Sequence, residues 1–419
     1  MRWKYSKFVS SQQAQAEAKA VYSGVAKVLF DNGKHLHYKR FNQFDCIKQK
    51  NTSNGVKVLD WKTIEFMNHK YHIVPIPKTD YMQEVLNSTV LFADLKYAYL
   101  KRIEFESGYR YYVILTLSGN APRKFQKCTH ENRTGVDFGT SSIATASNDE
   151  LNLVELAPKS GTYEKQIRHL QNLVDHKTRI HNKDNYDEFG RVKKGHHKWN
   201  ITKNCKKLKR KIRVLYRKQT AYVHDSHHAF INHLIQTTSE FILEPMEFDN
   251  LQKRSKKTER SDKVAKVKQK DGTVKEVRKY RRKKRFGHSI KNRSPGLMQA
   301  NLKKKAIQYD IPYYEINKTA FKASQLHHDT GEYVKPSLNE RFKTIDDHLV
   351  QRDLYSAFLM YNTSDSLTIP DFNKCNANFP RFIELQDKLI EQMKERGISF
   401  KQCFGFLHKR IHICIGLRR

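Results

Sequence analysis

The segment that most constrains the fold runs from Thr134 to Ser147 and reads TGVDFGTSSIATAS. It places one carboxylate, Asp137, inside a short apolar strand, and glycine and small hydroxyl residues turn the chain immediately afterwards. A second apolar strand follows at residues 143–146. Because a carboxylate is costly to bury without a cation or hydrogen-bond donors, this hairpin predicts either a metal site or a phosphate-binding loop in a covered α/β sheet.

The chain as a whole carries a large excess of positive charge. Its 419 residues include 79 Lys and Arg against 43 Asp and Glu, which gives a formal net charge of +36. Such an excess repels itself in a compact state unless a polyanion offsets it, so we expect nucleic acid rather than a membrane surface as the partner. No apolar run approaches the ~18 residues needed to cross a bilayer, and residues 1–10 hold no secretory core, so we expect a cytoplasmic protein.

Six cysteines are scattered along the chain without any CxxC spacing. This pattern predicts neither a disulfide framework nor a cysteine zinc site. Histidines gather between His196 and His233, but no thiol or carboxylate pattern accompanies them. We therefore interpret these histidines as polar helix faces rather than as metal ligands.

Changes of hydrophobic period divide the chain into three parts. Residues 1–130 are typical of a β-rich domain, because aromatic and aliphatic residues alternate on both sides of a turn at Ser107-Gly108. Residues 131–365 alternate between strand and helix patterns and predict the α/β domain, and residues 366–419 predict a helical tail. In that tail we expect a helix from Pro380 to Arg396.

The α/β domain contains two long segments between its strands. Helical spacing over 162–240 predicts an arm of two helices. The segment 250–294 is rich in cations and poor in large apolar residues, so we expect it to be mobile until it binds a partner. Ser294-Pro295 then predicts a helix start, with the serine as its cap.

Positive charge concentrates in the second helix of this arm and in the segment after it. Between Leu251 and Ser294 there are 19 Lys or Arg against four acids. Backbone phosphates are the natural partners of such stretches. The residues that we expect to contact nucleic acid are Lys206, Lys207, Lys209, Arg210, Lys211, Arg213, Arg281, Arg282, Lys283, Lys284 and Arg285.

Two further acids stand at the ends or on the buried faces of predicted core elements. An apolar strand ends at Glu244, and Asp353 lies within the apolar stripe of a helix expected over Val350–Tyr361. Magnesium prefers hard oxygen ligands, and two ions about 4 Å apart can activate a water and stabilise the leaving oxygen of a phosphodiester. Asp137, Glu244 and Asp353 are therefore the expected catalytic and magnesium-binding residues, rather than three independent structural acids.

The sequence around these three acids resembles a known family. The stretches GVDFGTSSIATAS, FILEPMEF and QRDLYSAFLMYN lie in the order strand, hairpin, helical insertion, strand and helix. They are similar to the split RuvC-type nuclease of the RNase H fold in TnpB (OrfB) proteins, which insertion sequences encode and which are relatives of type V CRISPR effectors.

The resemblance implies a function and a set of partners. It implies that Asp137, Glu244 and Asp353 bind magnesium and cut DNA, and that a guide RNA from the flanking element selects the target DNA. It also implies that residues 1–130 are a wedge-like domain that grips the guide RNA and the duplex beside the target.

The chain departs from the family in two places. Members usually carry a four-cysteine zinc ribbon between the last strand and the third acid, whereas residues 321–347 contain no cysteine. No zinc is therefore expected, and residues 318–347 are interpreted as a degenerate target-loading segment. The N-terminal part also has little room for the helical bundle that is usual in the family. A catalytically impaired protein that binds nucleic acid or regulates without turnover therefore stays open as an alternative.

A third alternative comes from the turn after Asp137. The sequence DFGTSS also looks like the first phosphate loop of actin-like and chaperone ATPases. Those proteins need a second Asp loop with glycine and a paired-glycine adenosine site, and the 17 glycines of this chain are scattered. The ATPase therefore ranks behind the nuclease and the binding protein.

Overall fold

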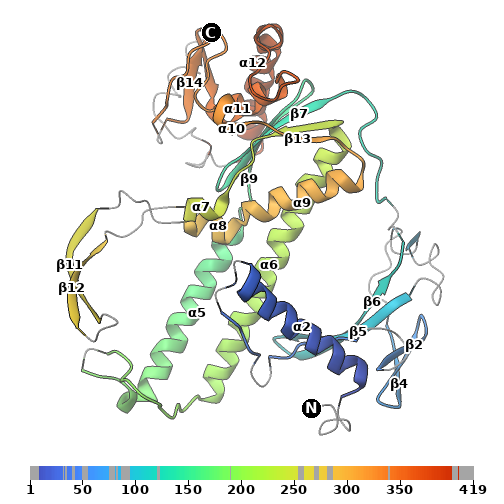
Figure 1. Cartoon of the computed structure of the whole chain (residues 1–419), viewed down its shortest axis with the longest axis vertical. Helices are drawn as coiled ribbons and strands as arrows, with labels where there is room; N and C mark the ends of the chain where they lie inside the picture. Colours follow the sequence, from blue (N-terminus) through green and yellow to red (C-terminus); the bar gives the residue numbers. More distant parts are fainter. Residues whose placement is uncertain are drawn as a thin grey trace. The chain divides into compact units, whose positions relative to one another are not determined.

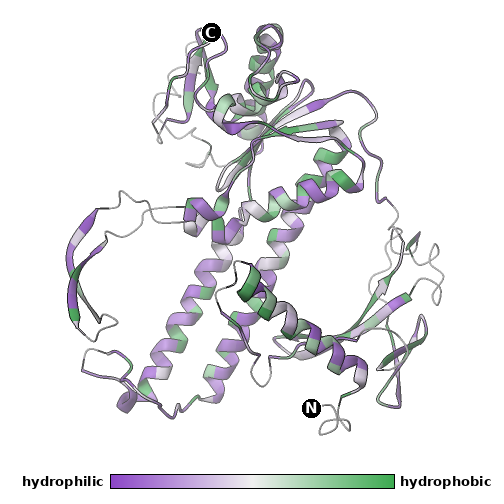
Figure 2. Cartoon of the chain, in the orientation of Figure 1, coloured by the Kyte–Doolittle hydropathy of each residue, from purple (hydrophilic) through white to green (hydrophobic). Residues whose placement is uncertain are grey.

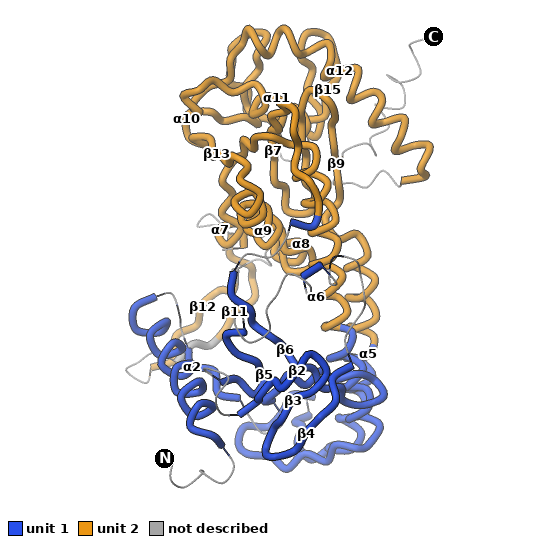
Figure 3. The backbone as a smooth tube through the Cα atoms, turned by 90° about the vertical axis from the view of Figure 1, so that its right-hand side faces the viewer, with its two compact units in different colours: residues 1–124, 170–215 blue, residues 125–169, 216–419 orange. Residues whose placement is uncertain are grey.

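A computed structural model of the chain describes residues 9–31, 33, 35–39, 43–49, 55–74, 81, 84–85, 95–119, 123–188, 190–252, 259–268, 273–280, 286–337, 340–398 and 404. The chain forms two compact units, which Figure 3 distinguishes by colour. Unit 1 comprises residues 1–124 and 170–215, and unit 2 comprises residues 125–169 and 216–419.

The unit boundaries fall inside two long helices, α5 (Ser160–Ile180) and α6 (Lys203–Thr237). These are the two helices that the sequence predicts for the arm. Figure 2 shows that both are mostly hydrophilic along their length. The structure therefore groups the far halves of the helices with the N-terminal residues, which a linear division of the sequence does not anticipate.

Besides the far halves of α5 and α6, unit 1 contains the helix α2 and two small sheets (Figure 1). The helix α2 (Ser11–Phe30) begins with a capping box in which the Ser10 hydroxyl accepts a hydrogen bond from the Gln13 amide. The first sheet has the order β2 (Val56–Asp60), β3 (Thr63–Phe66), β4 (His69–His72). The second has the order β1 (Cys46–Ile47), β5 (Leu95–Phe105), β6 (Gly108–Leu117). Strands β5 and β6 pair antiparallel about the predicted turn at Ser107-Gly108.

Unit 2 is organised around a five-stranded mixed sheet. Its order is β13 (Tyr313–Glu315), β10 (Glu240–Leu243), β7 (Arg133–Phe138), β8 (Ser142–Ala146), β9 (Leu151–Glu155). Strands β7, β8 and β9 form an antiparallel meander, whereas β10 pairs parallel with both β7 and β13. The expected hairpin around Asp137 is therefore present, and it lies at the centre of a mixed α/β domain.

The sheet is covered on both faces, because side chains on each strand alternate between two cores. Ala144, Ala146 and Ile242 pack with α11 (Arg352–Tyr361) and α12 (Phe372–Glu395). Val136, Ile143 and Leu243 pack with residues of α6 and of α9 (Pro295–Gln308). All five residues of β8 are buried, which explains why this strand is apolar or small throughout.

The remaining elements of unit 2 are short. Three small helices are α7 (Phe248–Gln252), α8 (Gly287–Arg293) and α10 (Lys318–Phe321). Two hairpins are formed by β11 (Arg260–Lys268) with β12 (Val274–Tyr280), and by β14 (Phe342–Ile345) with β15 (His348–Gln351). Part of the basic segment 250–294 therefore forms a hairpin and a helix, where the sequence predicted no independent structure.

Two predicted helix starts were wrong. The helix expected to begin at Val350 is α11, which begins at Arg352, and Val350 belongs to strand β15. The start of α11 is fixed by the Gln351 side chain, which accepts a hydrogen bond from the Leu354 amide. The last helix begins at Phe372 and includes Pro380, since the buried ring of Phe379 fixes this turn against the core. The cost of an internal proline, about 3 kcal/mol, is offset by this packing.

Ser294 does not cap α9 with its side chain. It adopts a left-handed conformation, φ 49°, and its backbone amide donates to the Ile290 carbonyl to close α8. The serine therefore ends one helix rather than capping the next, although Pro295 occupies the first position of α9 as expected.

Candidate functional site

Asp137 lies on β7, and Glu244 directly follows the end of the parallel neighbouring strand β10. Strand β10 pairs with β7 so that Leu243 lies opposite Val136, and the next residues on the two strands are Glu244 and Asp137. Leu243 and Val136 point into the core that α6 and α9 cover. Because side chains alternate along a strand, both acids are directed to the opposite face, where α11 packs.

Helix α11 crosses β7 at Gly135. A Cβ atom on Gly135 would lie 2.0 Å from the Ala357 carbonyl oxygen and 2.5 Å from the Tyr361 amide nitrogen, so glycine is required for this contact. Asp137 lies two residues along β7 from Gly135, and Asp353 lies four residues along α11 from Ala357, so both steps cover about 6 Å. The negative charge of Asp353 raises the pKa of Asp137, from which we infer that both residues lie on the same side of this crossing.

Two of the three acids act on the third, Asp137. Burial raises the pKa of Asp137 well above its usual range, and the negative charges of Asp353 and Glu244 raise it further. Asp137 as a residue is only half-buried, so its carboxylate has lost much of its hydration but water can still reach it. Burial also raises the pKa of Glu244, an effect that the nearby ammonium of Lys318 opposes. The structure therefore brings together the three acids that the sequence selected.

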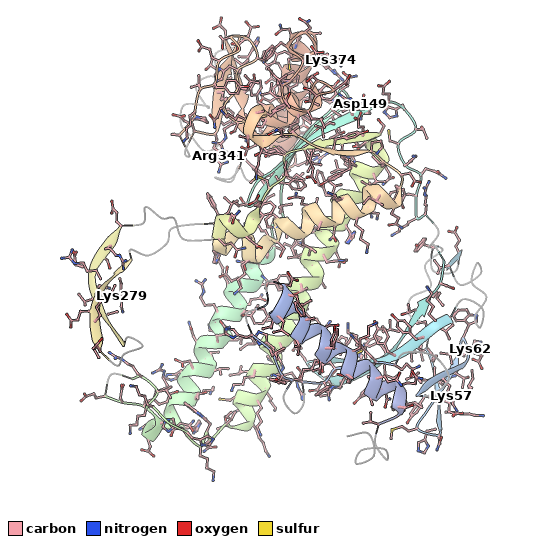
Figure 4. The ribbon with its side chains drawn as sticks, viewed as in Figure 1. Lys57, Lys62, Asp149, Lys279, Arg341 and Lys374 are labelled. Atoms are coloured by element: carbon pink, nitrogen blue, oxygen red, sulfur yellow. The ribbon has the colours of Figure 1, made fainter. Side chains whose placement is uncertain are left out.

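Two arginines contact Asp353, and the sequence patterns did not single out either of them. The Arg341 Nη1 lies 3.3 Å from Asp353 Oδ2, and Figure 4 labels Arg341. The Arg352 Nε and Nη2 lie 3.3 and 3.2 Å from Asp353 Oδ1. Both guanidinium groups lower the pKa of Asp137, so their charge also acts on the other acids. An arginine beside the third acid is visible in the sequence QRDLYS, but Arg341 lies in a polar stretch with no local signal.

The donor set fits a hard divalent cation by its chemistry. Asp137 accepts no hydrogen bond from any residue that the structure describes, and two further carboxylates raise its pKa. Such a group calls for a cation. No cluster of three or more His, Cys, Asp or Glu side chains among the described residues is arranged to hold a metal ion. Arginines, rather than a closed set of carboxylates, surround Asp353 in this arrangement.

The predicted basic residues fall into two groups. The first group lies on α6 in unit 1, where Lys206, Lys207, Lys211 and Arg213 are exposed and Lys209 and Arg210 are half-buried. Arg213 and Arg210 contact Glu104 of β5 at 2.6 and 3.2 Å, so these two cations are partly neutralised. The second group, Arg281, Arg282, Lys283, Lys284 and Arg285, lies outside the described residues.

The segment 318–347, which stands where related proteins carry a zinc ribbon, packs against the core through an aromatic cluster. His328 is 5% exposed, and its Nδ1 lies 2.8 Å from the hydroxyl of Tyr355 on α11. Its ring also packs against Phe358 and Phe379, with centroids 5.9 and 4.9 Å apart. Burial lowers the pKa of His328, which favours the neutral imidazole in this position. The segment therefore packs on the core without cysteine ligands.

Comparisons with known proteins give weak structural similarity. No family model matches the chain, and no curated protein matches it. Two solved structures are similar: a cryo-EM structure of the Cas12f1-sgRNA-target DNA complex, and a cryo-EM structure of a CRISPR-Cas12f ternary complex. The first is 15% identical with a TM-score of 0.37, covering 64% of this chain and 45% of that chain. The second is 13% identical with a TM-score of 0.29, covering 84% of this chain and 70% of that chain.

The chain therefore spans less than half of the length of the first of these structures. TM-scores of this size do not establish a shared fold. The functional site is therefore interpreted from the positions of Asp137, Glu244 and Asp353. In addition, no helix within the described ranges combines the length and the apolar character needed to cross a membrane.

Proposed function

We propose that this chain is an RNA-guided, magnesium-dependent DNA endonuclease of the RuvC type, related to the TnpB proteins of transposable elements. The observation that carries the proposal is the gathering of Asp137, Glu244 and Asp353 from three separate segments on one face of the sheet. The order of elements on which the sequence resemblance rests also supports it, since strand, hairpin, two-helix insertion, strand and helix follow one another along the chain.

In this proposal the three carboxylates hold the metal. Magnesium bound there would act as a Lewis acid on the phosphodiester and would make a bound water more acidic. The chain itself contributes Asp137 on β7, Glu244 directly after the paired strand β10, and Asp353 on a helix that packs closely against β7 at Gly135. Desolvation of Asp137 strengthens its interaction with any cation that binds there.

The proposed partners are a guide RNA from the flanking element and the target DNA. The exposed lysines at the start of α6 and the basic hairpin β11–β12 offer phosphate-binding surfaces that carry no sequence information of their own. The N-terminal sheets would hold the guide RNA, and the guide would select the target by base pairing.

The test is cleavage by the protein purified together with its bound nucleic acid. RNA that copurifies is sequenced, and a plasmid with the matching target is incubated in magnesium chloride. We expect Asp137→Asn, Glu244→Gln and Asp353→Asn each to lower the cleavage rate by about 1,000-fold, which equals about 4 kcal/mol of transition-state stabilisation. RNA binding should change by less than about twofold, because these acids do not contact the guide. Undiminished cleavage in all three variants contradicts the proposal.

A catalytically impaired nucleic-acid-binding protein is the second candidate. The contacts of Arg341 and Arg352 with Asp353 favour it, because they occupy a carboxylate that the nuclease needs for metal. This candidate predicts the same strong binding of RNA, but no plasmid nicking at any magnesium concentration. The cleavage assay on the unsubstituted protein distinguishes the two candidates.

A further inference from the structure

The ion pair between Arg341 and Asp353 is weak enough to be broken when another ion binds. The Arg341 side chain is 30% exposed, and it approaches Asp353 through Nη1 at 3.3 Å. Asp353 is the only carboxylate that Arg341 contacts among the described residues. A single long contact from a half-buried side chain is weak, of the order of 1 kcal/mol, so this guanidinium can leave at small cost.

Arg352 is held more firmly than Arg341. Its Nη1 donates to the Glu340 carbonyl at 2.8 Å, and its backbone amide donates to the Arg341 carbonyl at 2.9 Å. Two other guanidinium nitrogens face Asp353 Oδ1. Arg352 therefore stays beside the third acid, whereas Arg341 has freedom to exchange partners.

The region around these arginines is strongly cationic. Lys343 lies on β14, the strand that begins immediately after Arg341. It is 7% exposed, and its Nζ has no hydrogen-bond partner among the described residues. If a cation occupied Asp353, the two guanidinium groups would lose the carboxylate that they share and would require another anion. A planar guanidinium pairs equally well with a phosphate group.

We propose that Arg341 is an exchangeable counter-ion of Asp353, which competes with a divalent cation for this carboxylate and binds the phosphodiester of the nucleic acid when released. The inference rests on the proposed function, since it assigns the same three acids to the metal. It adds one positioning residue to the site and makes the third acid's partner depend on whether the substrate and the cation are present.

The experiment measures cation binding and nucleic-acid binding separately. Manganese chloride is titrated calorimetrically into the full chain without nucleic acid, and affinity for a short single-stranded DNA is measured in calcium chloride. For Arg341→Gln we expect manganese to bind three- to tenfold more tightly, about 0.7 to 1.4 kcal/mol, because a competitor is lost. We expect the DNA to bind about three- to tenfold more weakly, because a phosphate ligand is lost.

Two further variants separate charge from geometry. Arg341→Lys keeps the charge but loses the planar fork, so it should retain most of the competition with manganese and lose DNA affinity. Arg381→Gln is the matched control, because Arg381 pairs at 2.8 Å with Glu384 on α12 rather than with an acid of the site. It should leave manganese affinity unchanged.

The outcomes are distinct. If Arg341→Gln leaves manganese affinity unchanged or weakens it, while Asp353→Asn abolishes manganese binding, the counter-ion proposal is wrong and the metal site stands. If Asp353→Asn and Asp137→Asn leave manganese affinity unchanged, the proposed function fails and the counter-ion proposal fails with it. Opposite changes in manganese and DNA affinity support the proposal, since a purely structural role would not move them in opposite directions.

Discussion

Gly135 lies where α11 crosses β7, and a side chain there would meet main-chain atoms that cannot move without moving the helix. Its Cβ would lie 2.0 Å from the Ala357 carbonyl oxygen. We expect Gly135→Ala to lower the free energy of unfolding by about 3 kcal/mol or more, because overpacking forces α11 away from the sheet. Urea denaturation measures this loss.

The matched control for this substitution is Gly161→Ala. Gly161 lies in the first turn of α5, and no atom lies within 4 Å of the position that its Cβ would take. We expect this variant to be as stable as the unsubstituted chain or up to about 1 kcal/mol more stable, since alanine favours a helix over glycine. Equal losses in both variants would show that the close approach at Gly135 is not what matters.

Lys343 is an ammonium buried at a cost. Burial, assisted by Arg352, lowers the pKa of Lys343 from its ordinary 10.5 to about 8. Below pH 8 the folded protein holds this charge, so its penalty is fully present. Between pH 8 and 10.5 the unfolded chain binds the proton and the folded chain does not, so stability from this residue rises with pH.

Lys343→Met should therefore stabilise the protein at neutral pH. We expect the free energy of unfolding to rise by about 2 to 3 kcal/mol at pH 7. Each unit by which the pKa of Lys343 is lowered corresponds to about 1.4 kcal/mol, and the methionine recovers most but not all of this penalty. The gain should shrink as the pH approaches 10, where the lysine of the unsubstituted protein is neutral. Urea denaturation at pH 7 and at pH 9.5 measures both values, and a loss of stability at pH 7 contradicts the account.

At the scale of single residues, the sequence predicted the acids but not their partners. Asp137 and Glu244 could be found because each interrupts or ends an apolar strand, and a charge in such a place is conspicuous. Arg341 could not be found, because it lies in a polar stretch where an arginine is unremarkable. Arg341 reaches the site because the β14–β15 hairpin returns the chain, so that Asp353, twelve residues later, lies beside it.

At the scale of elements, strands were predicted better than helix boundaries. The strands β7, β8, β9 and β10 carry runs of buried apolar residues, and any register that buries them also fixes the position of the acids. Helix ends depend on caps, and the residues that cap these helices are not the ones that the sequence pattern selects. The Gln351 side chain starts α11, and Ser294 closes α8 instead of opening α9.

Gln386 joins α12 to β15 and gives the next prediction. This residue is 2% exposed on α12; its Oε1 accepts from the Gln351 amide at 2.8 Å, and its Nε2 donates to the Leu349 carbonyl at 3.1 Å. Gln386→Leu would leave an amide and a carbonyl of β15 buried without partners. We expect a loss of about 2 to 3 kcal/mol in the free energy of unfolding, measured by urea denaturation.

Gln392→Leu is the control for this element. Gln392 also lies on α12, but it is half-buried and its side chain makes no hydrogen bond with the residues that the structure describes. Its substitution should change stability by less than about 0.5 kcal/mol. If the two variants lose the same amount, the added leucine rather than the bridge to β15 is responsible.

At the scale of the whole molecule, the net charge of +36 predicts binding that depends steeply on salt. The field of the whole chain attracts a polyanion at long range, but counter-ions are released only where cations contact phosphates. Charge alone therefore does not say which surface binds. One surface can be tested by substitution, because three lysines near the start of α6 are exposed: Lys206, Lys207 and Lys211.

Substituting Lys206, Lys207 and Lys211 together by glutamine should weaken RNA binding and reduce its salt dependence. Each lost phosphate contact lowers the slope of log K against log salt by about 0.7 to 0.9, so three contacts lower it by about 2 to 3. Filter binding between 50 and 300 mM sodium chloride measures the slope. The control replaces Lys374, Lys388 and Lys394, which are exposed on α12, and removes the same charge from another surface. If both triple variants lower the slope equally, the binding follows the overall field of the molecule, and the α6 surface is not a contact site.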